Sequence, residues 1–238
     1  MTTSLSIIIP TKNEQRLLPG CLDSLKKQDT QSSWELLIID SSDSDKTAQI
    51  AIKYGARVIK EERLGKGLAL STGANEAKGQ ILCFTEADCI LPPNWLSVIE
   101  SEFNRNPDLV ALTSDYSFHD SSWTYNFILK FFLPISIWGY YILYNNHSLR
   151  GTNFAVKASA YHKCGGVSQT AKEFQDVELG LRLREVGKIR FVRAMRNKTS
   201  DRRIRGRLLV YIKEFVPTIW NLLVLRKIQE ESTYEDIR

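Results

Sequence analysis

The residues best able to do chemistry are carboxylates that follow apolar runs. Glu86 and Asp88 stand two positions apart, directly after the apolar run 80–85, so on an extended chain their side chains point to the same face. Carboxylates at that spacing suit a hard divalent cation whose shell is completed by phosphate oxygens. Taken alone, the pair is more simply interpreted as an exposed acidic turn.

Two further polar clusters also follow apolar runs. Thr11–Glu14 comes after the run 5–10, and Asp40–Asp43 ends the run 35–40. Asp and Ser residues at strand ends are often only turn formers. Parallel sheets, however, bind ligands beyond the carboxyl ends of their strands. Three clusters at one sheet edge therefore favour a binding site over three unrelated turns.

The elements that must position these clusters alternate along the first half of the chain. Apolar and β-branched runs predict strands, and apolar residues at helical spacing predict the helices between them. The strands are expected at 5–10, 35–40, 56–60 and 80–85, and the helices around 17–25, up to Tyr54 and over 67–78. This order predicts an α/β fold with a mainly parallel sheet and helices on both faces.

Phosphate-binding glycine motifs are missing from the printed sequence. Gly65-Lys-Gly67 is too short for a dinucleotide-binding fingerprint or a Walker A loop. A nicotinamide-dependent enzyme and a P-loop NTPase therefore lose support.

An ordered set of short motifs resembles the family 2 glycosyltransferases, which are inverting enzymes of the GT-A (Rossmann-like) fold. The resemblance covers roughly residues 5 to 192, and its motifs are Ile9–Glu14, Ile39–Thr47, Gly65–Gly67, Phe84–Asp88, Pro93–Leu96, Gly151–Asn153 and Gln175–Leu179. Each motif is weak alone, but the ordered set is specific. Glu86 stands where the family's metal-binding element usually begins with Asp, and Ser41 replaces a second Asp.

The resemblance implies a nucleoside diphosphate-sugar donor and a Mg²⁺ or Mn²⁺ cofactor. The residues it places around the donor are Pro10, Thr11, Asn13, Glu14, Asp40, Lys66, Glu86, Ala87 and Asp88. Among them, Asp40 would accept from the base, Lys66 would lie near the diphosphate, and Asp88 would hold the metal.

The resemblance also implies that Asp176 is the general base, which takes the proton of the acceptor hydroxyl. From the residues alone, Asp176 is more simply interpreted as a first-turn acid favoured by the helix dipole. For the acceptor or a phosphate we name Gly151, Asn153, Arg202 and Arg203. The two arginines could instead belong to a solvated basic loop.

Two aromatic, apolar segments lie in the second half of the chain. In 127–144, seven of the eighteen residues are aromatic, and both this segment and 208–225 are interrupted by Lys and Pro. Because a spanning helix needs about 20 largely apolar residues, neither is a good membrane span. Each suits a membrane interface, a core helix or a homo-oligomer interface, and we favour the interface of a membrane.

Composition and charge set the broader limits. The chain has 238 residues, of which 43% are hydrophobic and 25% charged, and this excludes collagen-like and wholly disordered classes. The net charge is +5, yet residues 182–207 hold eleven basic and two acidic side chains, which predicts an anionic partner.

The cysteines and the first residues bear on localisation. Cys21, Cys83, Cys89 and Cys164 fit neither a zinc site nor a disulfide framework, and we expect Cys21 and Cys83 to be buried thiols. Residues 1–6 lack a signal-peptide pattern. We therefore expect a cytoplasmic protein, peripheral on the cytoplasmic face of the membrane.

These observations combine into one hypothesis. We expect a GT-A catalytic domain over 1–200, with a donor-binding half (1–115) and an acceptor half (116–200), followed by a basic amphipathic segment (201–238). We expect it to transfer a sugar to a hydroxyl or phosphate of a sugar or lipid-linked acceptor. The alternatives are a nucleotidyltransferase, which releases pyrophosphate, and a basic nucleic-acid-binding protein. We expect no nucleic-acid partner, because the chain has no recognisable stacking or helix-turn-helix motif.

Overall fold

The computed structural model describes residues 4–120, 147–168 and 175–202. Within these residues, seven strands form one sheet in the order β3-β2-β1-β4-β7-β5-β8, and β6 pairs with β9 in a second, small sheet. The expected aromatic segments 127–144 and 208–225, and Arg203, lie outside the described residues.

The strand and helix bounds are as follows. The large sheet contains β1 (Leu5–Thr11), β2 (Trp34–Asp40), β3 (Arg57–Lys60), β4 (Ile81–Thr85), β5 (Leu109–Thr113), β7 (Asn153–Lys157) and β8 (Lys188–Phe191), and the small one contains β6 (Tyr116–Phe118) and β9 (Asn197–Thr199). The helices are α1 (Leu18–Leu25), α2 (Lys46–Lys53), α3 (Lys66–Glu76), α4 (Trp95–Arg105), α6 (Ala158–Lys163) and α7 (Gln175–Leu183), with a 3₁₀ turn η1 (Arg193–Met195).

The large sheet is mainly parallel, which confirms the predicted fold class. Strands β1, β2, β3 and β4 run parallel, and β5 runs parallel to β8. The exception is β7, which lies antiparallel between β4 and β5. Strand β7 comes from the expected acceptor half yet pairs with β4 of the donor half. The two halves thus share one sheet, and the boundary at residue 200 stays a prediction.

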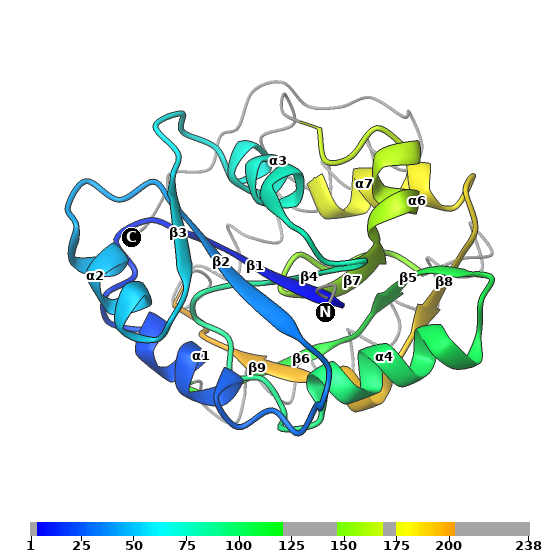
Figure 1. Cartoon of the computed structure of the whole chain (residues 1–238), viewed down its shortest axis with the longest axis horizontal. Helices are drawn as coiled ribbons and strands as arrows, with labels where there is room; N and C mark the ends of the chain where they lie inside the picture. The colour runs from blue at the N-terminus through cyan, green and yellow to red at the C-terminus, as the bar shows by residue number, and fades with distance from the viewer. Residues whose placement is uncertain (1–3, 121–146, 169–174, 203–238) are drawn as a thin grey trace.

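Helices cover both faces of the sheet, as Figure 1 shows with α3, α6 and α7 above it and α1, α2 and α4 below. Alternate residues of the buried strands point to opposite faces, so each strand feeds two separate clusters. In β1, Ile7 packs with α1 and α4, whereas Ile8 packs with α3. Strands β1, β2 and β4 are largely buried because both of their faces are covered, whereas β3, at the edge of the sheet, is only partly buried.

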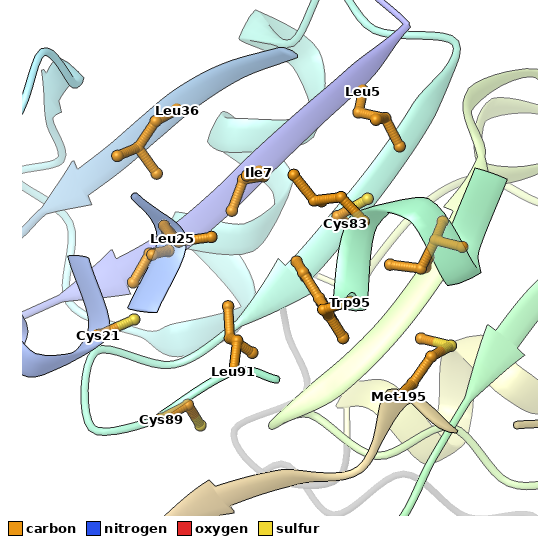
Figure 2. Close-up of a cluster of buried hydrophobic side chains, with 14 of the residues drawn as sticks. Leu5, Ile7, Cys21, Leu25, Leu36, Cys83, Cys89, Leu91, Trp95 and Met195 are labelled. Carbon is orange, nitrogen blue, oxygen red and sulfur yellow. The ribbon is translucent and has the colours of Figure 1, made fainter. Parts of the chain in front are cut away.

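The lower cluster contains most of the cysteines. Figure 2 shows Cys21, Cys83 and Cys89 among Leu5, Ile7, Leu25 and Trp95. Cys21 and Cys83 are buried free thiols, as predicted, and burial raises the thiol pKa of both. The three thiols therefore act as small apolar side chains in this core.

One edge of the sheet gathers the residues of interest. Thr11 lies opposite Asp40 where β1 and β2 end together. Thr85, the last residue of β4, lies opposite Asn153, the first residue of β7. Because β7 is reversed, its beginning rather than its end lies at this edge. The loops after three strands and before a fourth therefore meet there.

No helix in the described ranges is both long and apolar enough to cross a membrane.

Helix α3 approaches the sheet closely because it is rich in small residues. A Cβ at Gly73 would lie 2.4 Å from Cγ2 of Ile8 and 3.0 Å from Cγ1 of Ile39, two fully buried side chains. We predict that Gly73→Ala lowers the free energy of unfolding by about 1–3 kcal/mol, since the buried methyl groups must shift. Urea denaturation measures this. Asn75→Ala, on the exposed face of the same helix, is the control, and equal stability of the two variants would contradict the prediction.

Candidate active site

Asp40 is held by Thr11, the last residue of the neighbouring strand β1, and by Ser42 in the loop after β2. The hydroxyl of Thr11 donates to Oδ1 of Asp40 at 2.8 Å, and the Ser42 hydroxyl and backbone N–H donate to the same oxygen. Asp40 is 1% exposed. These donors hold the carboxylate in one orientation at the end of β2, so Asp40 and Thr11 lie together as the sequence predicted.

The loop after β1 is locked onto the loop after β2. The backbone N–H of Asn13 donates to the Ser42 hydroxyl at 2.7 Å, and its side-chain amide donates to Asp43 at 2.7 Å. Asn13 has a φ of 57°, a left-handed conformation that Asn tolerates better than most residues. The next residue, Glu14, is thereby turned inward and is 5% exposed.

The second polar group of the site is the Glu86 and Asp88 pair after β4. Glu86 forms an ion pair with Lys66, the first residue of α3. Asp88 accepts a hydrogen bond from the hydroxyl of Thr199 at 3.2 Å and contacts Arg202. Both carboxylates are nearly buried, at 8% and 4% exposed. Each acid of this predicted pair thus has a cation of the protein beside it.

Asp176 lies in the first turn of helix α7, and its carboxylate accepts from the backbone N–H of Gly151. Burial raises the pKa of Asp176, and the nearby Lys66 ammonium opposes this rise. A Cβ at Gly151 would lie 2.9 Å from Nζ of Lys66 and 3.3 Å from Oδ2 of Asp176. A side chain at this position would have to displace the end of Lys66, so Gly151 lies at the site itself.

Lys66 and Arg202 link the carboxylates of the site to one another. Lys66 pairs with Glu86 and also lies against Gly151, which holds Asp176. On the other side, Arg202 contacts both Asp88 and Glu14. Loops after β1, β2 and β4 and the start of α7 therefore form one continuous polar cluster at the sheet edge.

Asn153 lies deeper than expected. Its side chain is fully buried, accepts from the indole N–H of Trp95 at 2.8 Å and donates to the Met195 carbonyl at 2.6 Å. This amide is committed to holding β7 against α4 and η1, which corrects our expectation that it touches the acceptor or a phosphate. Ala87 is buried beside the acids, and Pro10 is the penultimate residue of β1.

Sequence reasoning missed Thr199, Tyr116 and Arg150. Thr199, at the end of β9, binds Asp88 although the two residues are 111 positions apart. Burial raises the pKa of Tyr116, while the charge of Arg150 lowers it and those of Glu86 and Asp176 raise it, so Tyr116 lies within the field of the acids. No motif in the sequence marks any of the three.

The basic stretch 182–207 is largely neutralised in the part that the structure describes. Arginines at four positions before Arg202 form ion pairs, namely Arg182 with Glu178, Arg184 with Glu185, Arg190 with Glu102 and Arg196 with Asp115. The sequence count therefore overstates the charge available to an anionic partner, because Glu178, Glu102 and Asp115 lie outside the stretch and do not enter that count.

The donor set for a metal consists of carboxylate oxygens. Among the described residues, no group of three or more His, Cys, Asp or Glu side chains could hold a metal ion. Glu86 and Asp88 supply two carboxylates, and Oε2 of Glu14 is buried with no hydrogen-bond partner in the described part of the chain. Hard oxygen donors of this kind fit Mg²⁺ or Mn²⁺ when water or a ligand such as a phosphate supplies the remaining oxygens.

Comparison with known sequences identifies one family. The model of "Glycosyl transferase family 2" matches residues 6–165. A dolichyl-phosphate beta-glucosyltransferase, ALG5D, of Trichomonas vaginalis is 21% identical over 177 residues, which are 67% of this chain and 54% of that protein. An uncharacterized glycosyltransferase of Haemophilus influenzae is 27% identical over 183 residues, which are 75% of this chain and 61% of that protein. The chain thus spans about half the length of the first of these relatives.

Solved structures share the fold. Glucosyl-3-phosphoglycerate synthase of Mycobacterium tuberculosis, in complex with Mn²⁺ and UDP-glucose, superposes with a TM-score of 0.68 at 19% identity, over 92% of this chain and 79% of that one. The mannosyltransferase PcManGT of Pyrobaculum calidifontis, in complex with GDP-mannose and Mn²⁺, gives a TM-score of 0.64 at 19% identity, over 90% and 64% of the two chains.

The raised pKa of Asp176 predicts that this residue costs stability at neutral pH. Asp176→Asn should leave the free energy of unfolding unchanged or raise it there. Any gain should shrink as the pH falls through the raised pKa toward the ordinary Asp value of about 4, because both states then bind the proton. Urea denaturation across this pH range measures it.

The matched control is Asp115→Asn. Asp115 is 4% exposed and paired with Arg196, so its loss should cost about 1–3 kcal/mol. Clear destabilisation by Asp176→Asn at neutral pH would contradict the prediction.

Proposed function

Since the chain belongs to glycosyl transferase family 2, we propose that it is an inverting, metal-dependent glycosyltransferase that takes its sugar from a nucleoside diphosphate-sugar. The observation that carries the proposal is the polar cluster in which Lys66 links Glu86 to the Gly151–Asp176 contact. It sets an acidic pair suited to a cation beside a carboxylate suited to a base. A transferase of this class needs the cation at the departing diphosphate and the base at the attacking oxygen, on opposite sides of the anomeric carbon.

The donor's nucleoside is assigned to the loops after β1 and β2. Asp40 is buried and held in one orientation, so it can accept from an N–H of the base. Oε2 of Glu14 is buried without a partner in the described residues, and a ribose hydroxyl would satisfy it. Thr11 and Asn13 act by fixing these two carboxylates.

The donor's diphosphate is assigned to the next part of the cluster. Asp88, supported by Glu86, would hold the Mg²⁺ or Mn²⁺ ion, which when bound neutralises charge on the departing diphosphate. Lys66 already lies between Glu86 and the Gly151–Asp176 contact, and its ammonium can add to that neutralisation. A divalent ion is supported by the Mn²⁺ complexes of the structural neighbours and by the oxygen-only donor set.

Asp176 is assigned the role of general base. Its carboxylate takes the proton of the attacking group, which is an acceptor hydroxyl or the P–OH of a singly ionised phosphate, while that oxygen attacks the anomeric carbon and the bond from that carbon to the diphosphate oxygen breaks. A single displacement inverts the anomeric configuration. Burial raises the pKa of Asp176, which brings it nearer to the range useful to a base at neutral pH.

For the acceptor we propose a lipid-linked molecule, with the protein peripheral on the cytoplasmic face of a membrane. The name of the Trichomonas relative, a dolichyl-phosphate glucosyltransferase, supports a lipid phosphate. The aromatic segments 127–144 and 208–225 and the pair Arg202 and Arg203 support the same choice from the sequence. A soluble phosphorylated acceptor is the alternative to be tested against it.

Donor binding is expected to require the acid after β4. In a thermal-shift panel of UDP- and GDP-sugars, one donor should raise the melting temperature with Mn²⁺ present and less so with chelator, because it binds only the folded state. Asp88→Asn should lose most of the Mn²⁺-dependent part of the shift. Asp108→Asn, which changes an acid at the opposite end of β5, is the control. A full shift in Asp88→Asn would remove Asp88 from metal binding.

We expect turnover to depend on Asp176 and donor binding to be independent of it. With the donor found above, a polyprenyl phosphate in detergent should be glycosylated faster than a soluble phosphorylated acid, and nucleoside diphosphate should be released. Asp176→Asn should lower kcat about 10²–10⁴-fold, with an unchanged donor-induced melting shift. Glu185→Gln, an exposed acid beyond the same helix, should act as the parent chain. Release of pyrophosphate would instead identify a nucleotidyltransferase.

A further inference from the structure

Arg202 lies between two nearly buried carboxylates that come from different loops. Its guanidinium forms an ion pair with Oε1 of Glu14, after β1, and its Nε lies 3.5 Å from Oδ2 of Asp88, after β4. The side chain of Arg202 is 29% exposed, whereas those of Glu14 and Asp88 are 6% and 3% exposed. One cation of the protein therefore serves two acids that have little contact with water.

The two acids need such a cation whenever no ligand is present. Buried carboxylates close together repel each other and are poorly stabilised by solvent, so one of them must take up a proton or a positive group must join them. Arg202 meets this need for Glu14 and Asp88, as Lys66 does for Glu86.

Of the ion pairs that Arg202 forms with Glu14 and Asp88, the contact with Asp88 is the looser. At 3.5 Å it is longer than the 2.7–3.2 Å of a direct N–H···O hydrogen bond, and the other Asp88 oxygen is held independently by Thr199. A competing cation could therefore take Oδ2 of Asp88 while Thr199 keeps the carboxylate in place.

We propose that Arg202 and the divalent cation occupy Asp88 in alternation. Arg202 neutralises Asp88 in the unloaded protein, and the divalent ion replaces it, because a guanidinium and a divalent ion cannot both lie against one buried carboxylate without strong repulsion. This inference rests on the proposed function only in taking Asp88 as the metal-binding acid. It gives Arg202 a role opposed to metal binding, in addition to contact with a phosphate.

Direct Mn²⁺ binding, measured without nucleotide from the paramagnetic resonance signal of the free ion, tests the exchange. Arg202→Gln should bind Mn²⁺ roughly ten-fold or more tightly than the parent chain, since the competing charge is gone. Arg202→Lys keeps that charge and should stay close to the parent. Arg196→Gln, which removes an arginine paired with Asp115, is the matched control and should change nothing. Adding Asp88→Asn to Arg202→Gln should abolish the gain.

A second measurement uses the parent chain and so does not depend on the folding of a variant. The ¹⁵Nε resonance of Arg202 should move toward that of a solvated arginine when Mg²⁺ is added without nucleotide. Mn²⁺ binding by Arg202→Gln that is equal to or weaker than that of the parent would overturn the proposal. So would an Arg202 resonance that does not move at saturating Mg²⁺.

These outcomes are separable from those of the proposed function. Sugar transfer by the parent chain, together with unchanged Mn²⁺ binding in Arg202→Gln, would reject the exchange and keep the glycosyltransferase. Tighter Mn²⁺ binding by Arg202→Gln, together with no sugar transfer by the parent chain, would keep the exchange and reject the glycosyltransferase.

Discussion

Repulsion among carboxylates at one edge of the sheet is the constraint on which the site depends. Glu14, Glu86 and Asp88 are each less than a tenth exposed, and Asp176 lies beside them. Such a group is stable only when positive charges are placed among its members. Lys66 and Arg202 provide them from the start of α3 and the end of β9. The fold is therefore required to bring distant helices and loops to the same edge, and a ligand that carries a cation can enter the same balance of charge.

The reversed strand β7 explains how Gly151 and Asp176 come to lie at the same sheet edge as Glu86 and Asp88. In a wholly parallel sheet the segment before β7 would begin at the far edge, away from the acids. Because β7 runs antiparallel to β4, Thr85 and Asn153 lie opposite each other, and the residues just before β7 meet those just after β4. Gly151 thereby reaches both Lys66 and Asp176. One inverted strand thus joins the acids that follow β4 to Asp176.

The sequence predicted the first four strands and their intervening helices to within a few residues, because apolar periodicity and burial on both sheet faces are local signals. It also predicted that the polar clusters after the strands lie at one edge, since the ends of parallel strands share an edge.

The side chains that pair with these acids could not be predicted from the sequence. Arg202 and Glu14 are 188 positions apart, and Thr199 and Asp88 are 111 apart, so no spacing rule connects them. Asn153 was misjudged for a related reason, because its partner Trp95 belongs to another helix. The basic stretch looked more charged than it is, since its compensating acids come from elsewhere in the chain.

The late arrival of β7 has a consequence for how the protein is made. A ribosome delivers β1 to β4 first, and these strands can pair among themselves as soon as they emerge. Strand β4, with the sequence ILCFT, then has an unpaired edge until Asn153–Lys157, which forms β7, leaves the exit tunnel. Such an edge is a template for mispairing with another nascent chain. We therefore expect the nascent chain to be open to such mispairing until β7 has been synthesised.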